Sequence, residues 1–381
     1  MLTTLIFAVL TPLASFVALA PQSPQVPAPA QPAVKTALTV PPLRAPTRNY
    51  VLPTAAETAA LRSGIQLYER GDYDKALEVF QRTFAEYPTS MMAQYEIALT
   101  HVARKEYQKA IDAAAKATEF KDPELARVYS LIGSVLDMTG DPKRAVEVYR
   151  QGIEFATEAA GTLYFNLAIT YAQSLNDIPA AKAAVKQAAL LDPTHASSQL
   201  LLAKLFLRED LRTPGLFAAG RFLILEPASP RIQEAYSLWY GVIRGNMAPD
   251  GKGGVTVQVN PAQSKDEGDL TQLDLHITLS RITAMAETDK TEIQKMAFQV
   301  DALLGVIAST PAAKDTSTFM GTYYMPYFLE MRAKKFVEPF VYYISQRTPF
   351  PGVKEWLAAN TERVDAFLSW SRSYEWPTPI K

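Results

Sequence analysis

Small residues recur at a nearly constant interval within the apolar pattern of the chain between Glu57 and Ser229. One series, with steps of 34, 35, 35 and 35 residues, comprises Gly64, Ala98, Gly133, Ala168 and Ala203. A second series, with steps of 34, 35 and 36 residues, comprises Ala76, Ala110, Ala145 and Ala181. Because antiparallel helices approach closely only where neither carries a bulky side chain, the two series predict repeated helix pairs.

Large apolar residues occupy further repeat positions and are predicted to fill the core between stacked pairs: Phe80, Tyr149, Tyr171, Val185 and Phe206. One helix pair cannot bury its apolar face alone, and about three or more are needed. Five copies meet that need, although in the fifth Gly215 replaces the alanine. The next predicted helix, Arg231–Ile243, carries more apolar surface than a solvated end helix, so we expect the C-terminal part to dock against it.

The clearest copy is Leu61–Pro88, LRSGIQLYERGDYDKALEVFQRTFAEYP. The residues that define its pattern are Gly64, Leu67, Tyr73, Ala76, Phe80 and Pro88. Their offsets resemble the tetratricopeptide repeat. The resemblance implies a mainly α fold, a right-handed α-solenoid of about five repeats plus a capping helix, spanning residues 53–243. It also implies a non-enzymatic adaptor or assembly scaffold, whose first helices line a concave face that binds a protein or peptide.

Repeat position implies which residues line that partner-binding groove: Tyr95, Leu99, Arg127, Ser130, Ser134, Phe165, Asn166, Ile169, Leu200 and Lys204. Asn166 is the strongest candidate, because asparagine in this slot of the family often bonds a peptide backbone. The alternative is that Asn166 bonds a neighbouring helix. The chaperone-binding members use a basic clamp for a terminal carboxylate, but Leu61 and Ile65 occupy the corresponding slots, so we expect no such clamp.

A glycine-rich junction, residues 244–254, separates the repeats from a predicted second domain, residues 255–381. That domain is predicted to be mostly helical with a short β element, because residues 255–259 alternate in polarity. Leu273, Leu275, Ile277 and Leu279 also alternate with polar residues, which favours a strand. A capping box from Asp269 to Gln272 favours a helix there, and we prefer the helix.

Helical spacing continues to the end of the chain. Helices are predicted after a capping box at Asp289 and Glu292, over Thr318–Ala333 with a break at Pro326, over Phe336–Ser345, and after Pro351 and Asn360. The aromatic residues between Phe319 and Tyr343 predict a packed core. An aromatic surface for a partner, sugar or peptide is the alternative.

The N-terminus predicts export. Residues 1–20 form an apolar run ending in a small-x-small site, as in a secretory signal peptide. Because Pro21 follows that site, an uncleaved anchor in the inner membrane is the alternative, and only then is membrane contact expected. Residues 21–52 are proline-rich and predict a disordered linker. We therefore expect a protein of the bacterial periplasm or cell envelope, with a cytosolic repeat protein as the rival.

Composition limits the chemistry. The net charge of −1 offers no basic surplus for nucleic acid, and the absence of cysteine excludes thiolate catalysis and zinc–thiolate sites. The three histidines lack metal-ligand spacing, and no phosphate loop or nucleophile elbow is present. The carboxylates Asp137, Asp141, Asp266, Glu267 and Asp269 are expected to be solvated. We predict no catalytic residue, cofactor or metal. The alternative is an enzyme or small-ligand domain at residues 255–381, whose substrate the repeats recruit.

Overall fold

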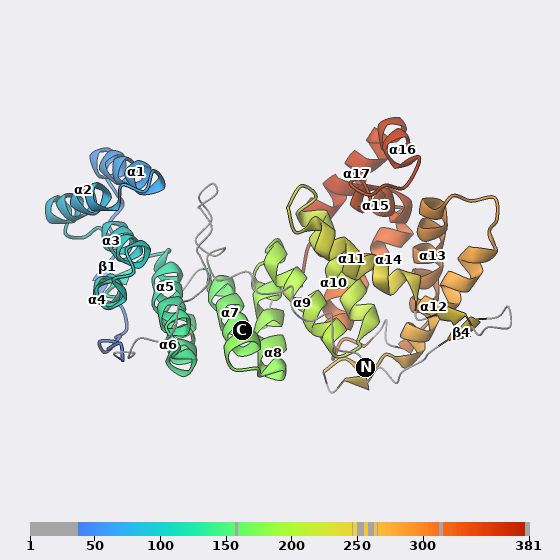
Figure 1. Cartoon of the computed structure of the whole chain (residues 1–381), viewed down its shortest axis with the longest axis horizontal. Coiled ribbons are helices and arrows are strands. Elements are labelled where there is room, and N and C mark those ends of the chain that lie inside the picture. Colours follow the sequence, from blue (N-terminus) through green and yellow to red (C-terminus); the bar gives the residue numbers. More distant parts are fainter. Residues whose placement is uncertain are drawn as a thin grey trace. The chain divides into compact units, whose positions relative to one another are not determined.

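The chain is built from helices, as predicted, and its strands are only two or three residues long (Figure 1). The computed structural model describes residues 37–156, 159–245, 247–249, 255–257, 263–264, 266–311 and 315–377. The predicted signal segment, the first part of the linker and most of the glycine-rich junction lie outside these residues. The chain divides into two compact units, Met1–Ala181 and Lys182–Lys381. The predicted domain limits along the sequence remain predictions.

Paired helices follow one another through the repeat region, which confirms the helical repeats. The first three pairs are α1 (Ala55–Glu69) and α2 (Tyr73–Glu86), α3 (Met91–Ala103) and α4 (Tyr107–Ala117), and α5 (Leu125–Met138) and α6 (Pro142–Phe155). In the fourth repeat, α7 (Ala160–Ile169), continued by the π-turn η2 (Thr170–Ser174), is followed along the chain by α8 (Ile178–Leu191). The fifth is α9 (Ala196–Arg208) with α10 (Arg212–Leu225), followed by α11 (Ile232–Arg244).

The small residues of the repeat lie against aromatic rings of the paired helix. A Cβ atom at Gly64 would overlap the ring of Phe80, and one at Gly133 would overlap the ring of Tyr149. Phe80 and Tyr149 are both fully buried. Glycine is therefore required at these positions for close approach of the two helices, as the spacing predicted.

The fourth repeat carries one extra residue, which the π-turn absorbs. Ala181 follows Ala168 by thirteen positions, whereas the interval between the two small residues is twelve in the first three repeats. A π-turn closes its hydrogen bond one residue further along the chain than an α-turn. η2 therefore explains the step of 36 between Ala145 and Ala181.

The second part of the predicted disordered linker is instead docked on the first unit. Leu38 and Leu43 offer backbone carbonyls to Arg144 Nη1 and Gln151 Nε2 of α6, each at 2.7 Å. Strand β1 (Arg48–Asn49) pairs in parallel with β2 (Phe120–Lys121). We call residues 37–49 the N-terminal strap. The expectation of a free tether fails for the strap because its backbone groups find side-chain and strand partners.

The second unit contains the fifth repeat and the C-terminal helices. Two short antiparallel pairs join β3 (Met247–Pro249) to β4 (Val255–Val257) and β5 (Gln263–Ser264) to β6 (Gly268–Asp269). The remaining elements are α12 (Thr271–Ala286), α13 (Glu292–Ile307), the π-turn η4 (Met320–Tyr324), α14 (Met325–Ala333), α15 (Val337–Ile344), α16 (Val353–Ala359) and α17 (Thr361–Ser373).

Helix α10 lies at the centre of this unit. It contacts α9, α11, α12 and α15 (Figure 1), and every residue from Arg212 to Ile224 is buried. Trp239 of α11 is 1% exposed and meets Phe340 of α15 at 6.1 Å between ring centroids. The predicted docking of the C-terminal part on the last repeat is therefore confirmed.

Several details of the C-terminal prediction need correction. Residues 271–286 are a helix, as preferred, but Leu270 precedes it without a side-chain cap, so the Asp269 capping box is wrong. The second capping box is formed by Thr291 and Gln294 instead of Asp289 and Glu292. Pro326 stands in the first turn of α14 directly after η4, because proline cannot donate its backbone hydrogen bond within a helix interior.

The aromatic residues between Phe319 and Tyr343 form a core, as predicted. Tyr323, Tyr324 and Tyr327 are fully buried, and Phe328 stacks on Phe217 of α10 at 4.3 Å. The alternative of an aromatic binding surface is wrong for these side chains. They fix α14 and α15 on the fifth repeat.

Candidate functional site

The predicted groove residues of the first unit lie on three first helices and differ in exposure. Tyr95 and Leu99 on α3, and Arg127, Ser130 and Ser134 on α5, are partly exposed. Those on α7 are buried, with exposed fractions of 2% for Phe165, 5% for Asn166 and 8% for Ile169. Repeat position predicted the helix that carries each residue, whereas it could not predict this gradient in burial.

Tyr95 and Arg127 meet on this face. The Arg127 guanidinium carbon lies 4.9 Å from the centroid of the Tyr95 ring, and its Nη1 lies 3.3 Å from Glu124. The Arg127 side chain is 39% exposed. Glu96, which follows Tyr95 on α3, was not singled out from the sequence, and it is only 7% exposed. Burial raises the pKa of Glu96 to about 7, although the charge of Arg127 acts to lower it.

Polar groups without partners lie on the same first helices. Among the described residues, the buried Ser130 Oγ has no hydrogen-bond partner. Asp137 Oδ2 accepts a hydrogen bond of 2.7 Å from Thr170 Oγ1, while its buried Oδ1 has no partner in this part of the chain. Asp137 is 7% exposed, so the expectation of a solvated carboxylate is wrong.

Two groove candidates are already engaged, and a third is buried. Ser134 Oγ lies 3.1 Å from the Tyr149 hydroxyl, within its own repeat. Lys204, in the second unit, pairs with Glu234 at 2.7 Å, and Leu200 is 4% exposed. Within the predicted set, an unsatisfied buried polar atom is found at Ser130, and a partly exposed guanidinium at Arg127.

The second helices of the first unit already hold an extended segment, the N-terminal strap. Gln108 of α4 forms two bonds of 2.9 Å with the backbone of Thr39, accepting from its N–H and donating to its carbonyl. A side-chain amide can satisfy both backbone groups of an extended residue at once. No local pattern indicated this contact, because the two residues are 69 positions apart.

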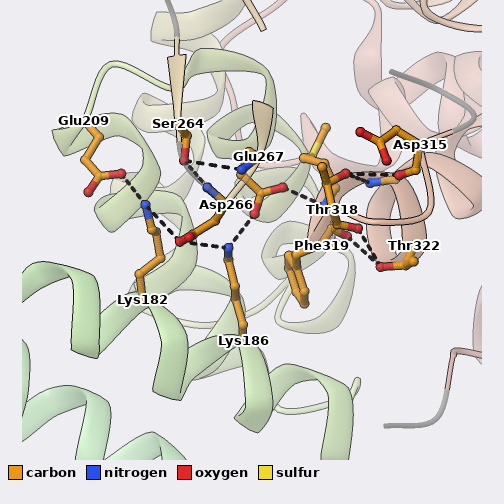
Figure 2. A network of polar contacts seen from close by, with 12 residues as sticks. Lys182, Lys186, Glu209, Ser264, Asp266, Glu267, Asp315, Thr318, Phe319 and Thr322 are labelled. Carbon is orange, nitrogen blue, oxygen red and sulfur yellow. Dashed lines mark hydrogen bonds and ion pairs between the residues drawn. The ribbon is translucent and has the colours of Figure 1, made fainter. Parts of the chain in front are cut away.

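A network of buried charges in the second unit was also missed (Figure 2). Lys182 and Lys186 are one turn apart on α8, with side chains only 6% and 10% exposed. Lys182 Nζ lies 2.5 Å from Glu209, and Lys186 Nζ lies 2.6 Å from Glu267. Asp266 approaches both lysines, at 3.7 and 3.6 Å.

Glu267 joins this network to the start of a helix. Its Oε2 accepts a 2.8 Å bond from the Met320 N–H at the beginning of η4 (Figure 2). The Glu267 side chain is 0% exposed, so the expectation of a solvated carboxylate is wrong here too. Because an anion at a helix N-terminus is stabilised by the helix dipole, the network fixes α8, the β5–β6 turn and η4 together. The one available signal was the lysine pair at positions i and i+4.

Two further site classes find no candidate in the described part of the chain. No group of three or more histidine, aspartate or glutamate residues is arranged there to hold a metal ion. No helix among the described residues is long and apolar enough to cross a membrane.

Comparisons with known proteins agree with the repeat pattern. Residues 61–126 and 126–158 match two family models, both described as tetratricopeptide repeat. A comparison with curated proteins gave no significant match.

Three solved structures are similar in part. A thermophilic tetratricopeptide-repeat protein of Thermus thermophilus is 22% identical over 49% of this chain and 97% of its own, with a TM-score of 0.38. PilF of Pseudomonas aeruginosa is 19% identical over 49% of this chain and 88% of its own, with a TM-score of 0.39. PilW, a type IV pilus biogenesis factor, is 12% identical over 70% of this chain and 100% of its own, with a TM-score of 0.38.

Proposed function

Because this chain is a tetratricopeptide-repeat protein, we propose that it is an interaction scaffold that binds an extended segment of a partner protein on α3, α5 and α7. The observation that carries this proposal is the buried Ser130 Oγ, which has no hydrogen-bond partner among the described residues, on a face that also holds Asn166 and Arg127. Buried polar groups in native proteins are almost always hydrogen-bonded. A partner's peptide groups would supply the missing bonds.

The N-terminal strap supports this choice of face. It already occupies part of the second helices α4 and α6, where Gln108, Arg144 and Gln151 bond its backbone. The strap also shows how the repeats recognise an extended backbone, through long side chains that carry amide or guanidinium donors. Asn166 and Arg127 offer the same chemistry on the first helices.

The test is binding of a selected peptide by Asn166→Ala. Peptides selected from a displayed random library on the purified chain provide the probe, and calorimetry measures the dissociation constant. Loss of the amide leaves backbone groups unsatisfied at about 1–3 kcal/mol, so we expect roughly fivefold to 150-fold weaker binding at an unchanged melting temperature. Gln173→Ala is the matched control, because it removes an exposed amide from the same repeat.

Two results would contradict the groove. One is equal peptide affinity of both variants, and the other is early melting of Asn166→Ala, which would show that the amide bonds a neighbouring helix. The variant Arg127→Ala then tests whether the charge of Arg127 contributes to peptide affinity in addition to hydrogen bonds with the peptide backbone. A peptide whose acidic residue contacts Arg127 should lose affinity in this variant and in high salt.

We propose further that the chain acts in a bacterial envelope. The support is the apolar run of residues 1–20 with its small-x-small end. Mass spectrometry of the protein recovered from envelope and cytosolic fractions tests the proposal. A mature chain beginning near Pro21, or an intact chain in the membrane fraction, is expected. An intact chain confined to the cytosol refutes export and leaves the groove proposal untouched.

A further inference from the structure

The outward face of α12 is apolar although its inward face is already packed. Leu279, Ile282 and Met285 are 42%, 42% and 48% exposed, and Leu275 is partly exposed beside them. On the opposite face Ile277 is fully buried. Single exposed apolar residues are ordinary, but a contiguous patch on one helix marks an interaction surface.

The spacing of this stripe fits a helix as its occupant. Leu275, Leu279, Ile282 and Ala286 follow one another at intervals of four, three and four residues. That spacing aligns side chains in the narrow seam along which two helices pack, knobs into holes. An extended peptide requires a groove with backbone partners, which an exposed helix surface does not offer.

The stripe is also uncharged, which narrows the identity of the second helix. The other residues on the outward face are Gln272, His276 and Thr283. Of the charged residues of α12, Asp274 is buried against α10 and Arg281 pairs with Glu292 at 3.4 Å. A helix that lies on a membrane surface carries lysine and arginine on its polar face, and α12 does not. A face without charge meets no like-charge repulsion when it faces itself.

The stripe is symmetric about a point midway between Leu279 and Ile282. A twofold axis there would place Leu279 against Ile282 of the partner subunit, and Leu275 against Ala286 of the partner subunit. The outer contacts would then join a large residue to a small one, which lets two surfaces interlock. We propose that α12 pairs antiparallel with α12 of a second copy of this chain and so forms a homodimer. This inference is independent of the proposed peptide groove.

A single helix pair gives a weak dimer. Stable interfaces bury about 1,200–2,000 Å² in total, and smaller ones are transient. We therefore expect a concentration-dependent equilibrium between monomer and dimer for the purified chain. Sedimentation equilibrium from low micromolar to several hundred micromolar protein measures it.

Charged variants locate the interface. Ile282→Glu should remain monomeric throughout the range, because it places two carboxylates at the centre of the pair. Leu191→Glu is the matched control, since Leu191 is 43% exposed on α8, and it should associate like the wild type. A wild type that stays monomeric at every concentration overturns the proposal, as does unchanged association of Ile282→Glu.

Engineered cysteines test the orientation independently. The chain contains no cysteine, so a disulfide in the variant Leu275→Cys/Ala286→Cys can form only between these two positions. Within one helix they are 11 positions apart, about 16 Å, beyond the reach of a disulfide at about 7 Å between Cα atoms. Mild oxidation should therefore give a covalent dimer. Leu275→Cys alone should stay monomeric, and a covalent dimer of this single variant, or none of the double variant, overturns antiparallel pairing.

Discussion

Helices α6 and α10 hold the same place in the third and fifth repeats, but they begin in different ways. In α6 the cap is local, since Asp141 accepts from the N–H of Arg144 at 3.3 Å and is 41% exposed. In α10 the preceding residue, Leu211, supplies no side-chain cap. Asp274 of α12 replaces it, accepting from the N–H groups of Arg212 and Thr213 at 3.1 and 2.9 Å.

The difference shows how a repeat is converted into part of a domain core. α6 buries one stripe and leaves the rest to solvent, whereas α10 is buried along its length. Because the start of α10 is buried away from water, its backbone N–H groups need acceptors from the C-terminal helices. Gln299 of α13 does the same at α11, donating to the Ile243 carbonyl at 2.7 Å. Thr213 and Pro214, which the sequence placed in a turn, lie in the buried first turn of α10.

Removal of the remote cap should have the largest effect. Asp274→Ala leaves two buried N–H groups and the Thr213 hydroxyl without their acceptor, at about 2–4 kcal/mol of unfolding free energy. Asp141→Ala, which removes the exposed local cap of α6, should cost about 0.5–1 kcal/mol. Urea denaturation followed by circular dichroism measures both. Equal losses for the two variants would contradict the distinction between local and remote caps.

Overpacking of an open repeat should cost somewhat less. Gly133→Leu drives a side chain into the buried Tyr149 ring, and such changes typically cost about 1–3 kcal/mol. Gly241→Ala in α11 is the control, because nothing lies within 4 Å of its new Cβ atom. That control should stabilise by about 0.5–1 kcal/mol, since alanine is the better helix former. An unchanged melting curve for Gly133→Leu would show that the repeat phase is wrong.

Local regularity explains what the sequence could predict. The small residues recur because each pair of helices solves the same packing problem, so the repeats and their phase were predictable. Asp274 and Arg212 are 62 positions apart, and nothing near either residue indicates the other. The same holds for Lys186 and Glu267. From the sequence alone, Glu267 is interpreted as a solvated carboxylate, and Lys186 is assigned no role. Repeat position placed Asn166 on its helix but carried no information on its burial.

The buried carboxyl of the first unit offers a contrast with Asp274. Burial raises the pKa of both, but hydrogen bonds from Thr213 and Arg212 act to lower only that of Asp274. Folded Glu96 holds its proton up to about pH 7, against an ordinary pKa of 4.5. Because the folded state binds more protons than the unfolded state in this window, unfolding free energy should fall as pH rises through it, by about 1–3 kcal/mol.

Glu96→Gln should remove that part of the pH dependence. Urea denaturation at the two ends of the window, below and above it, measures the change for wild type and variant. Glu78→Gln, at an exposed position on α2, is the control and should leave the pH dependence as it is. If the wild type gains stability across the window, the assignment to Glu96 is wrong.

The N-terminal strap should show the smallest effect, because its contacts are exposed. Gln108→Ala removes two bonds to the Thr39 backbone, which at the surface are together worth about 0.5–1 kcal/mol. Unlike the caps of α10, these bonds are replaced by water when they break, so global unfolding should hardly change. Hydrogen exchange should instead accelerate at the Thr39 amide. Gln151→Ala, which frees only the Leu43 carbonyl, should leave that amide protected. Equal protection of Thr39 in Gln108→Ala and wild type would show that the strap is held in place without Gln108.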